Sequence, residues 1–96
     1  MSGSGYKVRP ATDIVIPVHN SPEDVRRCIS SCVRSLGAGD RVIIVDDGSE
    51  DLTLPFILRK ASMDERIKVA TQSNQGVSAA RNLGVAKALG QYLAFL

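Results

Sequence analysis

The most constraining feature of this sequence is a short apolar run that ends abruptly in polar residues. Residues 41–49 read Arg-Val-Ile-Ile-Val-Asp-Asp-Gly-Ser, so four β-branched residues are followed at once by two carboxylates, a glycine and a hydroxyl. A continuous run of this kind is typical of a strand that is buried on both faces of a parallel sheet. In open α/β sheets, ligands bind in the crevice outside the carboxyl ends of the strands. The segment therefore predicts a central strand with a binding site at Asp46 and Asp47.

The same pattern occurs earlier, in residues 13–20, where an apolar run closes with Pro17, His19 and Asn20. Two less polar runs, at residues 66–71 and 91–96, predict two more strands. Because the first two strands are joined by a helix-length segment, we expect them to be parallel neighbours whose polar tips line one pocket.

Three segments between the strands have the apolar spacing of helices, and they cover residues 22–36, 51–62 and 76–89. Ser21 is the expected N-cap of the first helix, with Pro22 at its first position. In the third, four residues are small enough to let the backbone lie close to the sheet: Val77, Ala80, Gly84 and Ala88.

The order of these elements alternates strand and helix from end to end. With right-handed crossovers it predicts an α/β fold, a three-layer α/β/α Rossmann-like arrangement of four mostly parallel strands in the order 3-2-1-4. The first two helices are expected on one face of the sheet and the third on the other. The strand order then reverses between the first and fourth strands, which places a crevice beside His19 and Asp46.

Composition is that of one small domain. The 96 residues are 44% hydrophobic, which is enough for a single core, and the net charge of +2 is small and scattered, which argues against a nucleic-acid partner. The sequence has no stretch of roughly 20 apolar residues and no signal peptide, so we expect a cytoplasmic protein. Residues 1–11 are interpreted as a flexible leader or an expression remnant, and residues 12–96 as the domain.

Cys28 and Cys32 lie four residues apart on the apolar face of the first expected helix. We interpret them as small buried side chains. A metal site with His19 is the alternative, but the sequence has neither a Cys-x-x-Cys loop nor a second ligand pair.

The familiar phosphate-binding loops are missing: the sequence has neither Gly-x-Gly-x-x-Gly after the first strand nor a P-loop lysine motif. A carboxylate at Asp46 could accept a hydrogen bond from a base imide or a ribose hydroxyl. For Asp47-Gly48-Ser49, a purely turn-forming role is an equal alternative.

Four blocks of the chain resemble family 2 glycosyltransferases of the GT-A fold, namely residues 14–20, 45–51, 74–84 and 90–96. They occur in the family's order and cover residues 12–96. The resemblance implies that this chain is the N-terminal, nucleotide-binding part of an inverting enzyme. Such an enzyme would transfer a sugar from a nucleotide-sugar donor, UDP-linked in our interpretation, to a hydroxyl of an acceptor glycan or lipid-linked sugar. The full-length protein could then work at the cytoplasmic face of a membrane.

The resemblance also implies a set of nucleotide-binding residues: Pro17, His19, Asn20, Asp46, Asp47, Asn74, Gly76 and Arg81. In this set Asp46 would contact the base beside the wall formed by His19. Asp47 and Ser49 would chiefly shape the turn, and the residues from Asn74 to Arg81 would lie along the nucleotide and its diphosphate.

The sequence stops before the family's next motif. In the family, an Asp-x-Asp motif follows the last block and holds Mg²⁺ or Mn²⁺, whereas this chain ends at Leu96. We therefore expect the metal ligands and the catalytic base beyond Leu96, an inactive fragment, and self-association through the edge of strand 91–96.

Two other classes remain open at this point. One is a non-catalytic flavodoxin-like binding module, although a phospho-acceptor of that type would carry a lysine at the same edge. The other is a nucleotidyltransferase, which would usually begin with a Gly-rich loop where this chain has Pro17 to Asn20.

Overall fold

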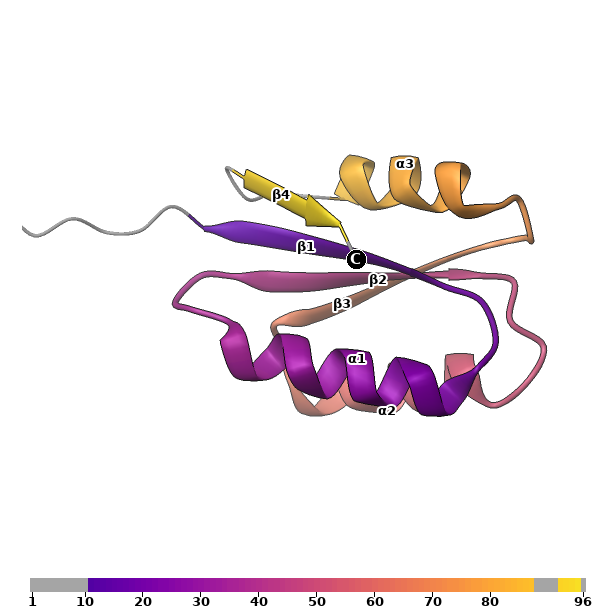
Figure 1. Ribbon diagram of the computed structural model, residues 1–96, viewed down its shortest axis with the longest axis horizontal. Helices are drawn as coiled ribbons and strands as arrows, with labels where there is room; N and C mark the ends of the chain where they lie inside the picture. The colour runs from indigo at the N-terminus through magenta and orange to yellow at the C-terminus, as the bar shows by residue number, and fades with distance from the viewer. Residues whose placement is uncertain (1–10, 88–91, 96) are drawn as a thin grey trace, which may run out of the picture.

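The computed structural model describes residues 11–87 and 92–95, which form a parallel sheet covered by helices on both faces (Figure 1). The elements in chain order are β1 (Thr12–Val18), α1 (Pro22–Ser35), β2 (Arg41–Asp47), α2 (Thr53–Met63), β3 (Ile67–Gln72), α3 (Val77–Lys87) and β4 (Tyr92–Phe95). In Figure 1, α1 and α2 lie together below the sheet and α3 lies above it. The predicted α/β class, with two helices on one face and the third on the other, is confirmed.

The sheet has the order β3-β2-β1-β4, and every neighbouring pair is parallel. Val18 of β1 lies opposite Asp46 of β2, and Asp46 lies opposite Thr71 of β3. The carboxyl ends of these three strands therefore meet at one edge. On the other side of β1, Val15 lies opposite Phe95, so the strand order reverses between β1 and β4.

The core is divided into two layers by β2, whose apolar residues are all at most 1% exposed. Val42 and Ile44 pack toward α1 and α2, whereas Ile43 and Val45 pack toward α3. Alternate strand residues point to opposite faces, so an uninterrupted β-branched run fills both layers at once. The strand expected from residues 41–49 is thus the centre of the fold.

The start of α1 differs from the expectation. Pro22 is at the beginning of the helix as predicted, but Ser21 makes no side-chain capping hydrogen bond. Its backbone is left-handed, with φ of 63°, whereas a capping side chain needs an extended backbone. The backbone N–H of Ser21 instead donates to Oδ2 of Asp51, 3.2 Å away in the β2–α2 loop. A long-range contact has replaced the local cap.

Helix α3 approaches the sheet through small residues. Gly84 and Ala80 are buried, and a Cβ atom on Gly84 would overlap the Val15 side chain of β1. Val77 was also predicted to lie close to the sheet, but this was wrong. It is 52% exposed, because the packing on the sheet starts one turn later, at Ala80. Ala88 lies outside the described residues.

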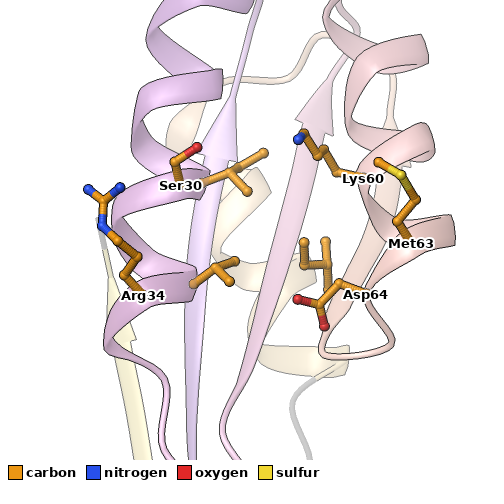
Figure 2. A pocket seen from close by; sticks show the side chains of 8 residues that line it. Ser30, Arg34, Lys60, Met63 and Asp64 are labelled. Carbon is orange, nitrogen blue, oxygen red and sulfur yellow. The ribbon is translucent and has the colours of Figure 1, made fainter.

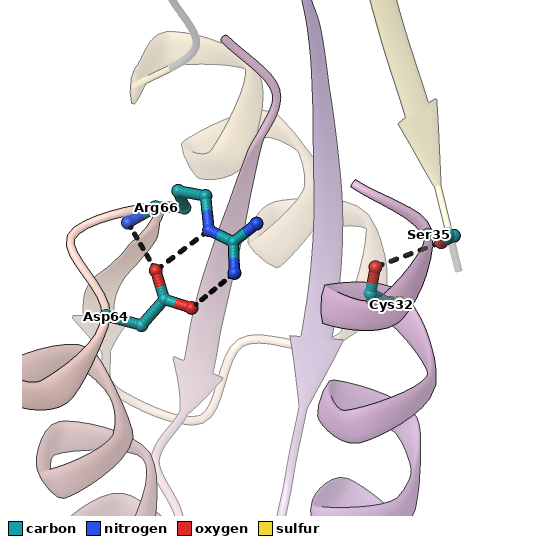
Figure 3. A network of polar contacts seen from close by, with 4 residues as sticks. All are labelled: Cys32, Ser35, Asp64 and Arg66. Atoms are coloured by element: carbon teal, nitrogen blue, oxygen red, sulfur yellow. Dashed lines mark hydrogen bonds and ion pairs between the residues drawn. The ribbon is translucent and has the colours of Figure 1, made fainter. Parts of the chain in front are cut away.

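The turn between α2 and β3 is held by an ion pair. Asp64 accepts hydrogen bonds from the backbone N–H, Nε and Nη2 of Arg66 at 3.0, 3.0 and 2.8 Å (Figure 3). These bonds, first from the Arg66 side chain and then from its backbone, lower the pKa of Asp64 from 3.8 to about 2. β3 begins at Ile67 and ends at Gln72, one residue later at each end than the sequence indicated.

None of the helices in the described part of the chain has the length and apolar character needed to cross a bilayer.

Candidate functional site

Three loops meet at the carboxyl edge of the sheet: residues 19–21 after β1, residues 48–52 after β2 and residues 73–76 after β3. Parallel pairing brings their starting points together, and a set of hydrogen bonds then joins them. The predicted wall, Pro17 to Asn20, and the predicted Asp46 to Ser49 segment are side by side in this cluster.

His19 and Asn20 tie the first loop to the second. Nδ1 of His19 lies 2.6 Å from the carbonyl oxygen of Asp47, and Nδ2 of Asn20 lies 3.3 Å from Nε2 of the same ring. Since a carbonyl oxygen can only accept, the proton belongs on Nδ1, and Nε2 then accepts from the Asn20 amide. The imidazole side chain is exposed, with both ring nitrogens engaged. The ring is therefore fixed in orientation while it remains accessible.

Asn20 contacts two further residues of the second loop. Its backbone N–H donates to Oγ of Ser49 at 2.8 Å, and its Oδ1 accepts from the backbone N–H of Glu50 at 2.9 Å. Asn20 and Ser21 both have left-handed backbones, with φ of 57° and 63°. Such residues cost on the order of 1–3 kcal/mol each and persist where surrounding contacts hold them, often at binding sites. Here those contacts come from Ser49, Glu50 and Asp51.

Asp46, the last residue but one of β2, has one carboxylate oxygen that accepts a hydrogen bond and one that accepts none from the part of the chain that the structure describes. The residue is 1% exposed, and its Oδ2 accepts from the backbone N–H of Ser49 at 3.0 Å. Its Oδ1 is also buried, and among the described residues nothing donates to it. A buried acceptor left without a donor costs about 1–3 kcal/mol, so each case requires an explanation. The sequence prediction placed a ligand contact at this residue.

Asp47 binds the third loop through its carboxylate. Its Oδ1 accepts from Nε2 of Gln72 and the backbone N–H of Gln75, both at 2.8 Å, and its Oδ2 accepts from the backbone N–H of Gly76 at 3.0 Å. The bond from Gln72, together with those from the backbone of Gln75 and Gly76, lowers the pKa of Asp47 below its ordinary value of 3.8. The carboxylate is therefore ionised and fixed.

These contacts correct the expectation that Asp47 and Ser49 chiefly shape the turn of the Asp-Asp-Gly-Ser segment. The side chain that bonds within the turn is Asp46, through Ser49, and not Asp47, which reaches across to the loop after β3. The reason is the alternation of the strand, which points successive side chains to opposite faces. Ser49 uses its hydroxyl on Asn20, in the first loop.

The second and third loops also touch through their backbones. Gly48 has φ of +71°, and a Cβ atom there would lie 2.7 Å from the backbone nitrogen of Asn74. Gly76 also has a positive φ, of +96°, but a Cβ atom there would meet nothing within 4 Å. Asn74 and Gly76 are exposed, and Arg81 is exposed on the first part of α3. Asp47 thus brings Gly76 to the edge where Asp46 and His19 lie.

Sequence reasoning did not single out Gln72 and Gln75, which hold the third loop through Asp47. The signal of Gln72 was readable, because its amide side chain stands at the end of the strand next to Asp47, whereas Gln75 donates through its backbone N–H, which carries no mark in the sequence. The sequence analysis also did not assign a role to Asp51, whose Oδ1 accepts a hydrogen bond from the backbone N–H of Thr53 at 2.9 Å, at the start of α2.

A cavity of about 260 Å³ lies behind the first loop, between β1 and α1, and His19, Asn20 and Cys28 are among its lining residues.

No three His, Cys, Asp or Glu side chains within residues 11–87 come close enough together to hold a metal ion. Both oxygens of Asp47 already accept N–H donors. The described residues therefore do not form a divalent-metal site by themselves.

Comparison with known proteins identifies the family of this chain. Residues 13–96 match the family model of glycosyl transferase family 2. The Bacillus subtilis (strain 168) protein EpsH, a glycosyltransferase by its name, is 37% identical over 87 residues, which are 91% of this chain and 25% of that protein. An uncharacterised glycosyltransferase of Haemophilus influenzae is 38% identical over 88 residues, 91% of this chain and 35% of that protein. The chain spans only about a quarter to a third of the length of these relatives.

The fold has a solved counterpart. A mannosyltransferase from Pyrobaculum calidifontis, in complex with GDP-Man and Mn²⁺, matches with a TM-score of 0.80 at 19% identity, over 90% of this chain and 26% of that chain. At this identity the likeness concerns the fold. The family match over residues 13–96 shows that the chain belongs to glycosyl transferase family 2.

Proposed function

We propose that this chain provides the nucleotide-binding part of an inverting glycosyltransferase that takes a sugar from a UDP-linked donor. The observation that carries the proposal is Oδ1 of Asp46, a buried acceptor that no described residue satisfies, at the carboxyl end of the central strand. The imide N–H of uracil is a donor of matching chemistry. A ligand that reached this oxygen would displace the groups that cover it and satisfy it.

His19 is the second element of the proposed base site. Its ring is exposed and held at both nitrogens, by the Asp47 carbonyl and the Asn20 amide. A planar side chain with a fixed orientation can stack on a base at little entropic cost. Pro17 and Asn20 would complete this wall, as the family resemblance implies.

The third loop is the proposed place for the diphosphate. Asp47 fixes the loop so that Asn74 and Gly76 precede α3, and Arg81 follows one turn into the helix. A guanidinium suits phosphate oxygens, and the positive end of the helix dipole favours an anion. Asp47 itself is proposed to act by positioning this loop, because its oxygens are engaged.

The mannosyltransferase counterpart was solved with Mn²⁺, and a divalent metal would neutralise the departing diphosphate in such an enzyme. For this protein we propose Mg²⁺ or Mn²⁺, with ligands outside the described residues. We likewise propose that the acceptor is a glycan or a lipid-linked sugar, and that the catalytic base lies outside the described residues.

The test is a titration of the isotopically labelled chain with UDP, followed by NMR. We expect saturable shifts at residues 17–20 and 46–49, and weaker binding by uridine than by UDP. Asp46→Asn should abolish the shifts, whereas Glu65→Gln, at the opposite edge of the sheet, should preserve them. GDP that bound as well as UDP would reject the uridine assignment. The absence of shifts at millimolar UDP in folded protein would reject the site.

A further inference from the structure

A second concave surface lies on the helical face formed by α1 and α2. A cavity of about 330 Å³ opens between the later turns of α1 and α2 and extends to the start of β3 (Figure 2). Its apolar lining comes from Ile29 and Val33 of α1, Met63 of α2 and Ile67 of β3. Ile67 is the first residue of β3, so this cavity is near the amino edge of the sheet, opposite Asp46.

A second cavity, of about 400 Å³, lies between the first turns of the same two helices, where Leu52, Pro55 and Phe56 supply apolar lining. Leu52 is 73% exposed and Met63 is 63% exposed. Residues at positions 52, 56, 60 and 63 follow helical three- and four-residue steps, so they share one face of α2. The two cavities share no lining residue but both lie along the seam between α1 and α2, and we call this surface, from Leu52 to Met63 along α2 and across to α1, the α1–α2 groove. Its length along eleven residues of helix is about 16 Å.

The charges along the α1–α2 groove are unbalanced. Its two acidic lining residues are already paired with arginines that are not part of the lining: Glu23 with Arg26 at 2.9 Å and Asp64 with Arg66 at 2.8 Å. The basic lining residues are Arg34, Arg59 and Lys60.

Figure 2 shows Ser30 and Arg34 on one side of the opening and Lys60 and Met63 on the other. The Lys60 ammonium lies 5.6 Å from the centroid of the Phe56 ring, which holds it beside the apolar surface. The groove is therefore apolar along its floor and basic along its rim.

We propose that the α1–α2 groove binds an acidic amphipathic helix of a partner protein. About 16 Å corresponds to three helical turns, so one apolar stripe of such a helix could cover the groove from Leu52 to Met63. Carboxylates beside that stripe would meet Arg34, Arg59 and Lys60. The groove starts at Leu52, in the second loop of the site, but none of the proposed nucleotide contacts lines it, so this interaction does not depend on the proposed function.

The probe is a fluorescein-labelled 14-residue helical peptide with leucines at three- and four-residue steps and glutamates beside them, titrated with the 96-residue chain by fluorescence anisotropy. A second peptide has lysine at every glutamate position. We expect saturable binding of the acidic peptide and at least tenfold weaker binding of the basic one. Lys60→Glu, which leaves Arg34 and Arg59 as the basic lining residues, should weaken the binding of the acidic peptide and strengthen that of the basic one, an opposite pair of changes that a loss of folding could not produce.

The matched variants are Met63→Ser and Leu58→Ser. Both residues are exposed on α2, but Leu58 does not line the groove. Met63→Ser should weaken the binding of the acidic peptide about tenfold, and Leu58→Ser should change the affinity for this peptide less than twofold. Circular dichroism checks the fold of each variant. Equal binding of the two peptides, binding of neither, or equal effects of the two serine variants would overturn the proposal. Sedimentation velocity showing a dimer that Met63→Ser converts to a monomer would assign the surface to a second copy of this chain and overturn it as well.

Discussion

Nδ1 of His19 lies 2.6 Å from the backbone carbonyl oxygen of Asp47, and the carboxylate of the same aspartate holds the loop at Gln75 and Gly76. One residue at the end of β2 thus orients the ring on one side and fixes the third loop on the other. The proposed base and diphosphate contacts are therefore coupled through Asp47.

Replacement of His19 tests the stacking role. His19→Ala removes the ring and should weaken UDP binding roughly tenfold, since base stacking contributes on the order of 1–3 kcal/mol. His19→Phe keeps a flat ring but loses the bond to the Asp47 carbonyl, so its loss should be smaller. Isothermal titration of both variants measures this order. Equal losses would show that the ring does not stack on the base.

Replacement of Asp47 tests the positioning role. Asp47→Asn retains the size of the side chain but weakens the bonds from Gln75 N–H and Gly76 N–H, so amide hydrogen exchange at these two residues should accelerate. UDP binding should weaken while the shifts at Asp46 remain. Exchange rates like those of the wild-type chain, with binding lost, would instead indicate direct contact between Asp47 and the ligand.

Gly48 and Gly76 form a matched pair for the contact between loops. Both have positive φ, so alanine at either position pays a left-handed backbone cost of about 1–2 kcal/mol. Only at Gly48 would the new methyl group also press on the backbone of Asn74. Gly48→Ala should therefore lower the free energy of unfolding clearly more than Gly76→Ala in urea titrations. Equal values would mean that the loops separate without cost.

Acid should weaken the α2–β3 turn. The pKa of Asp64 is lowered to about 2 in the folded chain by Arg66, so its contribution to stability is present above pH 4 and is lost as the pH falls toward 2. Urea unfolding at pH 6, 4 and 2.5 measures this slope, to which Asp47, whose pKa is also lowered, contributes. Asp64→Asn should flatten the slope, and an unchanged slope would place the titrating group elsewhere.

Cys32 should react slowly with thiol reagents in the native chain. Burial, reinforced by neighbouring Cys28, raises its pKa from 9.0 to about 11, so little thiolate is present at pH 8. In a Cys28→Ser variant, labelling of Cys32 should accelerate strongly when urea is added. Rapid labelling without denaturant would show that this face of α1 is open to solvent.

The sequence was sufficient for the class of fold because β-branched runs and helical spacing are local signals. Residues 42–45 predicted a doubly buried strand, and all four are buried. The sequence also contains the information that separates the hydrogen-bonding roles of Asp46 and Asp47. Strand alternation puts Asp46 on the face of Ile44 and Asp47 on the face of Val45, so the two carboxylates are directed to different neighbours.

The conformation at Asn20 and Ser21 could not have been read from neighbouring residues. Their left-handed backbones are held by Ser49, Glu50 and Asp51, which are 29 to 30 positions away in the sequence. The local signal, serine followed by proline, favours an ordinary N-cap. Contacts that form only after the strands pair override it, and they lie where the proposed site lies.

The two faces of the sheet hold their helices in different ways. Branched side chains of α1 pack among those of β1 and β2, whereas α3 lies close on β1 and β2 through the small residues Gly84 and Ala80, with Leu83 beside them. The start of α3 is fixed separately, because the backbone N–H of Gly76, directly before the helix, donates to the carboxylate of Asp47. A single side chain at the end of the central strand therefore ties the beginning of α3 to β2.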